Sequence, residues 1–219
     1  MLSTKRRPCR AVKVGDVLIG GGFPIAVQSM TNTDTRDIGA TVAQIRQLFE
    51  AGCDIVRLSV LNKQAAACLG DIRKQIEGPL VADIHFNHKL ALAAIEAGFD
   101  KIRINPGNIG ADWKVRELAQ AAKEAEVPIR IGVNSGSLPE DTLEKHGHDD
   151  PRAFVEAALR EVALLEENDF HNIIISVKSS SAATSFQAYS MLAEKCDYPL
   201  HIGITEAGTL ETGTIKSSV

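Results

Sequence analysis

The sequence predicts an α/β barrel, and two observations support this prediction. First, β-branched runs of five to eight residues alternate along the chain with segments that have the apolar period of helices. This alternation is typical of βαβ units, whose strands form a parallel sheet. Second, the motif A-G-x-D-x-[VI]-R-[LI]-[SN] occurs at residues 51–59 and again at 97–105, two βα units later. Alternate strands with the same inward arginine favour a closed (β/α)8 barrel, the TIM barrel.

We expect seven strands, at residues 25–30, 54–60, 79–86, 101–105, 128–134, 172–178 and 199–205. They are apolar nearly throughout, which is typical of strands that are covered on both faces. A barrel needs eight strands, so we expect residues 1–219 to form one incomplete domain, truncated after the seventh strand. Residues 12–24 precede the first strand and are expected to form a β-hairpin that covers the bottom of the barrel.

Three helices are expected from apolar stripes: Ile38, Val42, Ile45 and Phe49; Val155, Leu159 and Val162; and Ala182, Phe186, Tyr189 and Ala193. Ala-Gly pairs at 51–52 and 97–98 suit helix C-caps.

An open doubly wound sheet is the alternative fold, but the run Gly20–Gly22 lacks the G-x-G-x-x-G spacing and precedes the first strand. The polar residues 136–151 are expected to form a lid or a disordered loop, with His146 and His148 in solvent.

Composition excludes several classes of protein. The 219 residues carry a net charge of −4, so no basic field suggests a nucleic-acid partner. No apolar run approaches the ~18 residues of a membrane span, and no signal peptide is evident, so we expect a cytoplasmic protein with no membrane partner. The four cysteines, Cys9, Cys53, Cys68 and Cys196, are scattered; we expect reduced thiols and no metal site in this chain.

Polar side chains gather at the expected carboxyl ends of the strands, where barrel enzymes place their active sites. They are Gln28, Ser29, Thr31, Arg57, Ser59, Asp83, His85, Arg103, Asn105, Asn108, Arg130, Asn134, Lys178, Ser179, Thr205 and Glu206. Four of these are cations that would repel one another without an anion. Guanidinium groups match phosphate oxygens in pairs, and the loops at 105–110 and 134–137 add backbone N–H donors. We therefore expect a diphosphate ligand.

Other interpretations of single residues remain open. Each arginine alone can be a salt-bridge partner. Asp83 and His85 can bind a metal ion or can form orienting hydrogen bonds to the arginines or to the ligand. Lys178 can be the Schiff-base lysine of an aldolase, since barrels often place one on the sixth strand, and neighbouring arginines would lower its pKa. Glu206 can be a salt-bridge acceptor or a general acid/base.

Six stretches carry a resemblance that covers nearly the whole chain: VQSMTNTDT (27–35), VADIHF (81–86), RINPGNIG (103–110), RIGVNSGSL (130–138), SVKSS (176–180) and GITEAG (203–208). The chain resembles the N-terminal barrel of the 4-hydroxy-3-methylbut-2-enyl diphosphate synthases, iron–sulfur oxidoreductases of the non-mevalonate isoprenoid pathway. The resemblance implies a two-electron reductive ring opening and dehydration of 2-C-methyl-D-erythritol 2,4-cyclodiphosphate.

The resemblance also implies roles for particular residues. Arg57, Arg103, Arg130, Lys178 and Asn134 would grip the diphosphate, and Asp83, His85 and Asn105 are further candidates for substrate binding. Glu206, in the T-E-A-G motif, would be the proton donor.

The family holds a [4Fe–4S] cluster on three cysteines and a glutamate in a separate C-terminal domain, and it acts as a homodimer with flavodoxin or ferredoxin as electron donor. The four cysteines of this chain lie outside that motif. The isolated chain is therefore expected to be inactive. Two other functions remain as alternatives: a different barrel enzyme, either a Schiff-base aldolase or a relative of dihydropteroate synthase, and a non-catalytic diphosphate binder.

Overall fold

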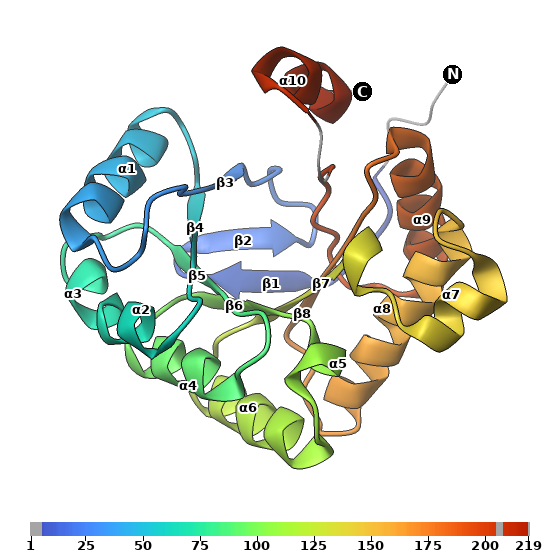
Figure 1. Ribbon diagram of the computed structural model, residues 1–219, viewed down its shortest axis with the longest axis horizontal. Coiled ribbons are helices and arrows are strands. Elements are labelled where there is room, and N and C mark those ends of the chain that lie inside the picture. The colour runs from blue at the N-terminus through green and yellow to red at the C-terminus, as the bar shows by residue number, and fades with distance from the viewer. Residues whose placement is uncertain (1–5, 205–207, 219) are drawn as a thin grey trace.

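The computed structural model describes residues 6–204 and 208–218 (Figure 1). Its strands are β1 (Ala11–Val14), β2 (Val17–Gly20), β3 (Gln28–Met30), β4 (Ile55–Ser59), β5 (Leu80–Asp83), β6 (Lys101–Ile104), β7 (Ile129–Asn134) and β8 (Ile173–Lys178). Its helices are α1 (Ile38–Glu50), α2 (Lys63–Ala67), α3 (Leu69–Arg73), α4 (His88–Glu96), α5 (Pro106–Ile109), α6 (Asp112–Glu124), the 3₁₀ turn η1 (Ser135–Ser137), α7 (Glu140–His146), α8 (Pro151–Glu166), α9 (Ala182–Lys195) and α10 (Leu210–Ser218).

Strands β3 to β8 form one parallel sheet in chain order, which confirms the predicted βαβ repeat. Figure 1 shows α1, α3, α4, α6 and α8 in an arc outside these strands. Strands β1 and β2 pair antiparallel, as predicted for the N-terminal hairpin. The hairpin packs Val12 and Val14 against Ile55, Val81 and Ile174, which lie near the amino ends of β4, β5 and β8. The hairpin therefore covers the end of the sheet opposite the carboxyl ends of the strands.

The prediction of a seventh strand at 199–205 is wrong within the described residues. This segment makes a single parallel bridge, Ile175 to Leu200. The Ile175 N–H donates to Pro199 O at 3.1 Å, and the His201 N–H donates to Ile175 O at 2.8 Å. Pro199 has no N–H to add to a ladder, and Gly203 weakens strand propensity. The described sheet is thus a six-stranded part of a TIM-barrel-like fold.

The sequence suggested strands that are apolar on both faces, but the structure shows apolar side chains facing outward and many polar side chains facing inward. The outward residues pack against the helices in one core and include Val56, Leu58, Leu80, Ala82, Ile102, Ile104, Ile129, Ile131, Val133, Ile173, Ile175 and Val177. The residues between them face inward and include most of the predicted site. Because helices cover only the outer face, the doubly wound alternative is wrong.

The helix boundaries follow local capping. Asp37 caps α1 by accepting a hydrogen bond from the Ala40 N–H at 3.0 Å. Gly52 and Gly98 follow α1 and α4 with φ of 97° and 80°, which confirms the predicted C-caps. The stripe predicted for α9 is rotated by one position, because its buried residues are Ser185, Ala188, Tyr189 and Leu192. Phe186 is 67% exposed.

The prediction of a long loop or lid at 136–151 is also wrong. The segment contains α7, which packs on α8 and buries Thr142 completely. His146 is not in solvent: its side chain is 12% exposed, and its Nε2 lies 2.8 Å from Glu156 Oε2. His148 is exposed as expected. No helix within 6–204 and 208–218 is long and apolar enough to cross a membrane.

Candidate functional site

Asp83 is the buried anchor of the inward-facing cations. Its carboxylate accepts a hydrogen bond from Arg103 Nη1 at 3.0 Å, and Arg57 Nε lies 3.6 Å from its other oxygen. Burial alone would raise the pKa of Asp83, but Arg103 and Arg57 outweigh burial and lower it. Asp83 therefore orients two arginines, as one of the two interpretations predicted. No group of three or more His, Cys, Asp or Glu residues that could hold a metal ion exists in the described parts of the chain.

The backbone of β7 shapes the position of Arg103. Arg103 Nη2 donates to Gly132 O at 3.0 Å. A Cβ atom at Gly132 would lie 2.3 Å from Arg103 Nε, closer than real Cβ atoms approach. Glycine at position 132 therefore creates the space for the guanidinium. Arg103 Nε is buried and has no hydrogen-bond partner in the described structure.

Among the described residues, Arg130 is a buried cation with no ion-pair partner. Its Cα is paired in register with Arg103 on the neighbouring strand, and its side chain is 1% exposed. Within the described structure, Nε and Nη1 have no hydrogen-bond partner. Burial, followed by repulsion from Arg57 and Arg103, lowers the pKa of Arg130 to about 9, so the group stays charged at neutral pH. Because an unpaired buried charge is costly, this arrangement indicates an anionic ligand.

Lys178 ends β8, and its Cα is paired in register with Asn134. Burial is the largest effect on its amine, followed by repulsion from Arg130, Arg57 and Arg103, and together they lower the pKa of Lys178 to about 7. The pKa lowering that the sequence suggested is thus present. A Cβ atom at Gly203 would lie 2.9 Å from Lys178 Nζ, so this second glycine leaves room for the amine.

A pocket of about 280 Å³ opens at the carboxyl ends of β5, β6 and β7. It is lined by His85, Phe86, Arg103, Asn105, Asn108, Asn134, Ser135, Gly136 and Ser137. The structure therefore brings together four predicted binding residues, His85, Arg103, Asn105 and Asn134, in one pocket. Ser135 Oγ is buried there without a partner in the described structure. Amide, hydroxyl and guanidinium donors in one pocket suit a phosphate group.

Several predicted residues have other roles or lie elsewhere. Gln28 accepts a hydrogen bond from Lys101 at 2.9 Å. Thr31 Oγ1 is buried without a partner in the described structure. The Ser179 N–H donates to Ser185 Oγ at 3.0 Å near the start of α9. Thr205 and Glu206 lie outside the described residues.

Sequence reasoning missed two inward-facing groups. Lys101 is fully buried, and its pKa lies well below the ordinary value because of burial and then repulsion from Arg130 and Arg57. The pKa of His201 is also well below its ordinary value because of burial and then the charges of Arg130 and Lys178. Lys101 could have been found from strand alternation, since it lies two residues before Arg103 and so on the same face. His201 gave no comparable signal because its segment forms only one bridge.

The described residues do not fit an iron–sulfur cluster. All four cysteines are free thiols, partly buried, and none belongs to a metal-binding group in the described structure. Burial raises the pKa of Cys53 and of Cys196, which favours the neutral thiol. Iron–sulfur clusters are held by thiolates.

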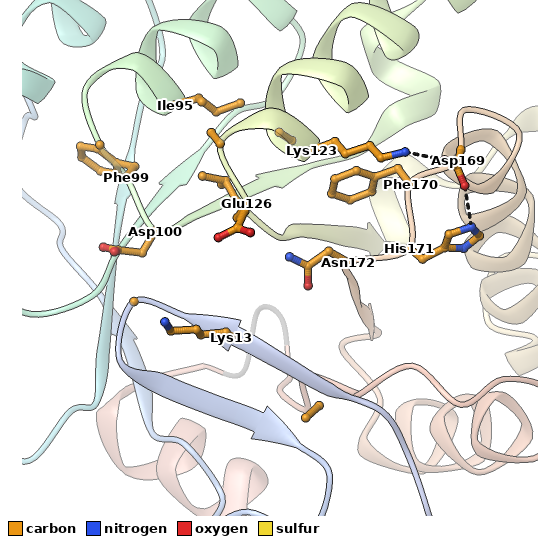
Figure 2. A pocket seen from close by; sticks show the side chains of 16 residues that line it. Lys13, Ile95, Phe99, Asp100, Lys123, Glu126, Asp169, Phe170, His171 and Asn172 are labelled. Carbon is orange, nitrogen blue, oxygen red and sulfur yellow. Dashed lines mark hydrogen bonds and ion pairs between the residues drawn. The ribbon is translucent and has the colours of Figure 1, made fainter.

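A larger cavity of about 830 Å³ lies at the opposite end of the sheet, beside the hairpin (Figure 2). Figure 2 shows Lys123, Asp169 and His171 at its edge, where Asp169 pairs with Lys123 and lies 3.5 Å from His171. Asp100, on the same lining, pairs with Arg73 at 2.9 Å. The other charged residues of the lining, Lys13 and Glu126, are exposed, so among the described residues this cavity has no counterpart of the buried, unpaired Arg130.

Fold and site together define a TIM-barrel-like domain with a cluster of inward-facing cations. Solved structures support the fold alone. Type I 3-dehydroquinate dehydratase from Clostridium difficile has a TM-score of 0.68 at 17% identity, with 95% of this chain and 84% of that chain covered. Dihydropteroate synthase from Xanthomonas albilineans has a TM-score of 0.57 at 13% identity, with 96% and 97% covered.

The GcpE TIM-barrel domain matches residues 9–219, and the chain belongs to this family. This confirms the resemblance found in the sequence. A relative from Symbiobacterium thermophilum, named 4-hydroxy-3-methylbut-2-en-1-yl diphosphate synthase (flavodoxin), is 59% identical over 98% of this chain and 58% of its own length. Relatives of the same name from Thermodesulfovibrio yellowstonii and Nitratidesulfovibrio vulgaris are 57% and 55% identical over 98% and 100% of this chain. The chain spans 62% and 56% of those two proteins.

Proposed function

We propose that this chain is the diphosphate-binding barrel of a 4-hydroxy-3-methylbut-2-enyl diphosphate synthase. Its substrate would be 2-C-methyl-D-erythritol 2,4-cyclodiphosphate, which the whole enzyme reduces by two electrons, opening the ring with loss of water. The observation that carries the proposal is Arg130, a buried guanidinium with two partnerless nitrogens beside Arg57 and Arg103. A multiply charged anion supplies the missing partner.

The proposed binding mode follows the unsatisfied donors. Arg103 Nε and Arg130 Nε and Nη1 have no partner within residues 6–204 and 208–218 and would donate to phosphate oxygens, while Asp83 keeps Arg103 and Arg57 in place. His85, Asn105 and Asn134 line the pocket beside Arg103 and would hold the rest of the ligand. Lys178 gains a proton as the anion binds, because a nearby negative charge raises its pKa.

Proton donation and electron supply complete the proposal. We assign proton donation to Glu206, from the match of GITEAG to the family motif. The electrons would come from a [4Fe–4S] cluster in a C-terminal domain outside residues 1–219, in agreement with the greater length of the relatives. The donor would be flavodoxin, which the relatives' names include, with ferredoxin as the other candidate. The whole protein would be a cytoplasmic homodimer, and residues 1–219 alone would be inactive.

We also propose that further strands complete the barrel. A groove of about 440 Å³ lies between residues 23–28 and residues 199–202. Ile25 and Ile202 line it and are 78% and 75% exposed. Exposed apolar groups on both sides of this groove suit an inserted strand that would pair with β3.

Calorimetry tests the proposed function. The cyclodiphosphate should bind the chain in a 1:1 ratio, and Arg130→Met should weaken binding by about tenfold or more, since a charged hydrogen bond contributes about 1.5–3 kcal/mol. Reduced flavodoxin added to the isolated chain should give no product. If Arg130→Met bound the cyclodiphosphate as tightly as the original chain, the proposal would be wrong.

A further inference from the structure

Within the described part of the chain, Lys178 is the cation of the site whose amine is both accessible and unpaired. Lys101, the other amine that faces the site, is 0% exposed and donates a hydrogen bond to Gln28. Lys178 is partly exposed, and in the described structure its amine donates no hydrogen bond and forms no ion pair. It lies at the end of the sixth strand of the parallel sheet, facing the same interior as the arginines.

The amine is also neutral for much of the time near physiological pH. Burial and then the three guanidiniums lower the pKa of Lys178 to about 7. An ordinary exposed lysine side chain has a pKa of about 10.4 and is almost entirely protonated there. A neutral amine has the lone pair that attacks carbonyl carbon, and lysines desolvated beside other cations are activated in this way.

The surroundings select which carbonyl compound reaches the amine. Arg103 and Arg130 hold unsatisfied N–H donors that suit a phosphate group. Gly203 makes room for the Lys178 side chain, since a Cβ atom at position 203 would lie 2.9 Å from Nζ, and Arg130, Arg57 and Arg103 lie close enough to repel the charged amine. A ligand whose phosphate is bound by the arginines therefore places its other end near Lys178.

We propose that Lys178 forms an imine with small aldehydes or ketones that carry a phosphate group. This goes beyond the proposed reduction, although it rests on the same anion site. The Nζ lone pair forms a bond to the carbonyl carbon, and the carbonyl oxygen takes a proton from the nitrogen. The resulting carbinolamine loses water as its C–O bond breaks, which leaves a C=N bond, and no oxidant or reductant is consumed.

Pyridoxal 5′-phosphate is a suitable probe, followed by borohydride, whose hydride reduces the imine to a stable secondary amine. Peptide mass spectrometry then locates the label. We expect labelling at Lys178 to be at least tenfold faster than at Lys89, and pyridoxal, which has no phosphate, to react at least tenfold more slowly at Lys178. The rate at Lys178 should rise with pH and level off above pH 7, because the bound phosphate raises the pKa of the amine above its value of about 7 in the free protein.

Two variants serve as controls. Lys178→Arg keeps the charge, cannot form an imine and should lose the fast label, whereas Lys89→Arg should keep it. Labelling spread evenly over exposed lysines, or equal rates for the two probes at Lys178, would overturn the proposal. Calorimetry with inorganic pyrophosphate separates the two ideas. Pyrophosphate binding without fast labelling refutes the imine alone, whereas fast labelling without pyrophosphate binding supports the imine and refutes the diphosphate function.

Discussion

Arg103 occupies the space that a side chain at Gly132 would fill, since a Cβ atom there would lie 2.3 Å from Arg103 Nε. The same glycine accepts a hydrogen bond from Arg103 Nη2 through its carbonyl oxygen at 3.0 Å. With Asp83 holding Nη1, the guanidinium is fixed at two of its three nitrogens. The third, Nε, is the unsatisfied donor. Gly132 is thus a positioning residue for the proposed anion site.

Gly132→Ala should displace Arg103 and weaken anion binding. The added methyl group meets the guanidinium itself, so the side chain must leave its hydrogen bonds with Asp83 and Gly132. We expect pyrophosphate affinity to fall by about tenfold or more and the free energy of unfolding to fall by about 1–3 kcal/mol. Calorimetry and urea denaturation measure the two effects.

Gly70→Ala is the matched control. Gly70 lies in α3, and a Cβ atom there would meet nothing within 4 Å. It should leave affinity unchanged and raise stability by up to about 1 kcal/mol through helix propensity. An unchanged affinity in Gly132→Ala would show that the position of Arg103 does not matter for the anion.

Arg130→Met should stabilise the protein while it weakens anion binding. The substitution removes a buried charge that has two partnerless nitrogens and two cationic neighbours, Arg57 and Arg103. We expect the free energy of unfolding to rise by about 1–4 kcal/mol, the range seen when well-packed apolar residues replace buried ion pairs. Urea denaturation without ligand checks this sign.

Arg73→Met removes a well-paired arginine and serves as the control for Arg130→Met. Arg73 pairs with Asp100 at 2.9 Å and donates to the carbonyl oxygens of Ile76 and Gly78. Its loss should lower the free energy of unfolding by about 1–3 kcal/mol and leave pyrophosphate affinity unchanged. If Arg130→Met destabilised the protein as Arg73→Met does, Arg130 would be a structural cation.

Periodicity in the sequence predicted the parallel strands and the hairpin because each depends on local pattern. The β-branched runs became β3 to β8, and the glycines at 52 and 98 ended helices as expected. The prediction of a strand at 199–205 failed because strand formation depends on pairing with neighbouring strands, which no local pattern reports, and this segment makes only one bridge. The helix α7 was missed because its stability comes from packing on α8.

The candidate site was predictable in part. Alternation of side chains within KIRIN (101–105) places Arg103 inward, and the polar residues at the expected carboxyl ends of the other strands included Arg57, Arg130 and Lys178. The depth of burial was not predictable: Arg130 is the second residue of β7 and lies inside the sheet, not at its rim. The fully buried Lys101 was missed because lysines are rarely buried, so the pattern alone gave it no special weight.

Asp83→Asn should destabilise the protein, and an anion should partly restore its stability. Asp83 is 4% exposed and is the carboxylate between Arg103 and Arg57. Removing its charge leaves both guanidiniums uncompensated, at a cost of about 3–5 kcal/mol. Pyrophosphate should raise the melting temperature of Asp83→Asn more than that of the original protein, because the anion replaces lost negative charge.

Asp197→Asn is the control for this prediction. Asp197 pairs with Arg10 at 2.6 Å, but both side chains are exposed, so the loss should be about 1 kcal/mol or less. Thermal unfolding with and without pyrophosphate distinguishes the two variants. Equal melting shifts for Asp83→Asn and Asp197→Asn would contradict the account of Asp83 as the buried counter-charge.

Stability in the absence of ligand should rise with pH above about 7. Burial and the neighbouring arginines lower the pKa of Lys178 to about 7 from 10.5. Between these values the unfolded chain binds the proton and the folded chain does not, so the free energy of unfolding increases with pH. Below pH 7 both states are protonated and the folded state bears the full cost of the buried charge. Urea denaturation at pH 6 and pH 9 should show a smaller rise in Lys178→Met than in the original protein.

Anion affinity should have the opposite pH dependence at Lys178. Pyrophosphate favours the ammonium form of Lys178, so binding above pH 7 requires the protein to take up a proton. The affinity of the original protein for pyrophosphate should therefore fall by up to about tenfold per pH unit relative to that of Lys178→Arg, whose guanidinium stays charged. Comparing the two proteins with the same ligand cancels the ionisation of pyrophosphate itself. Calorimetry from pH 6 to pH 9 in two buffers of different ionisation enthalpy also counts the protons directly. If Lys178→Arg took up as many protons on binding pyrophosphate above pH 7 as the original protein does, the proton would belong to another group. The buried Lys101 would be the first candidate, since burial and then Arg130 and Arg57 also lower its pKa.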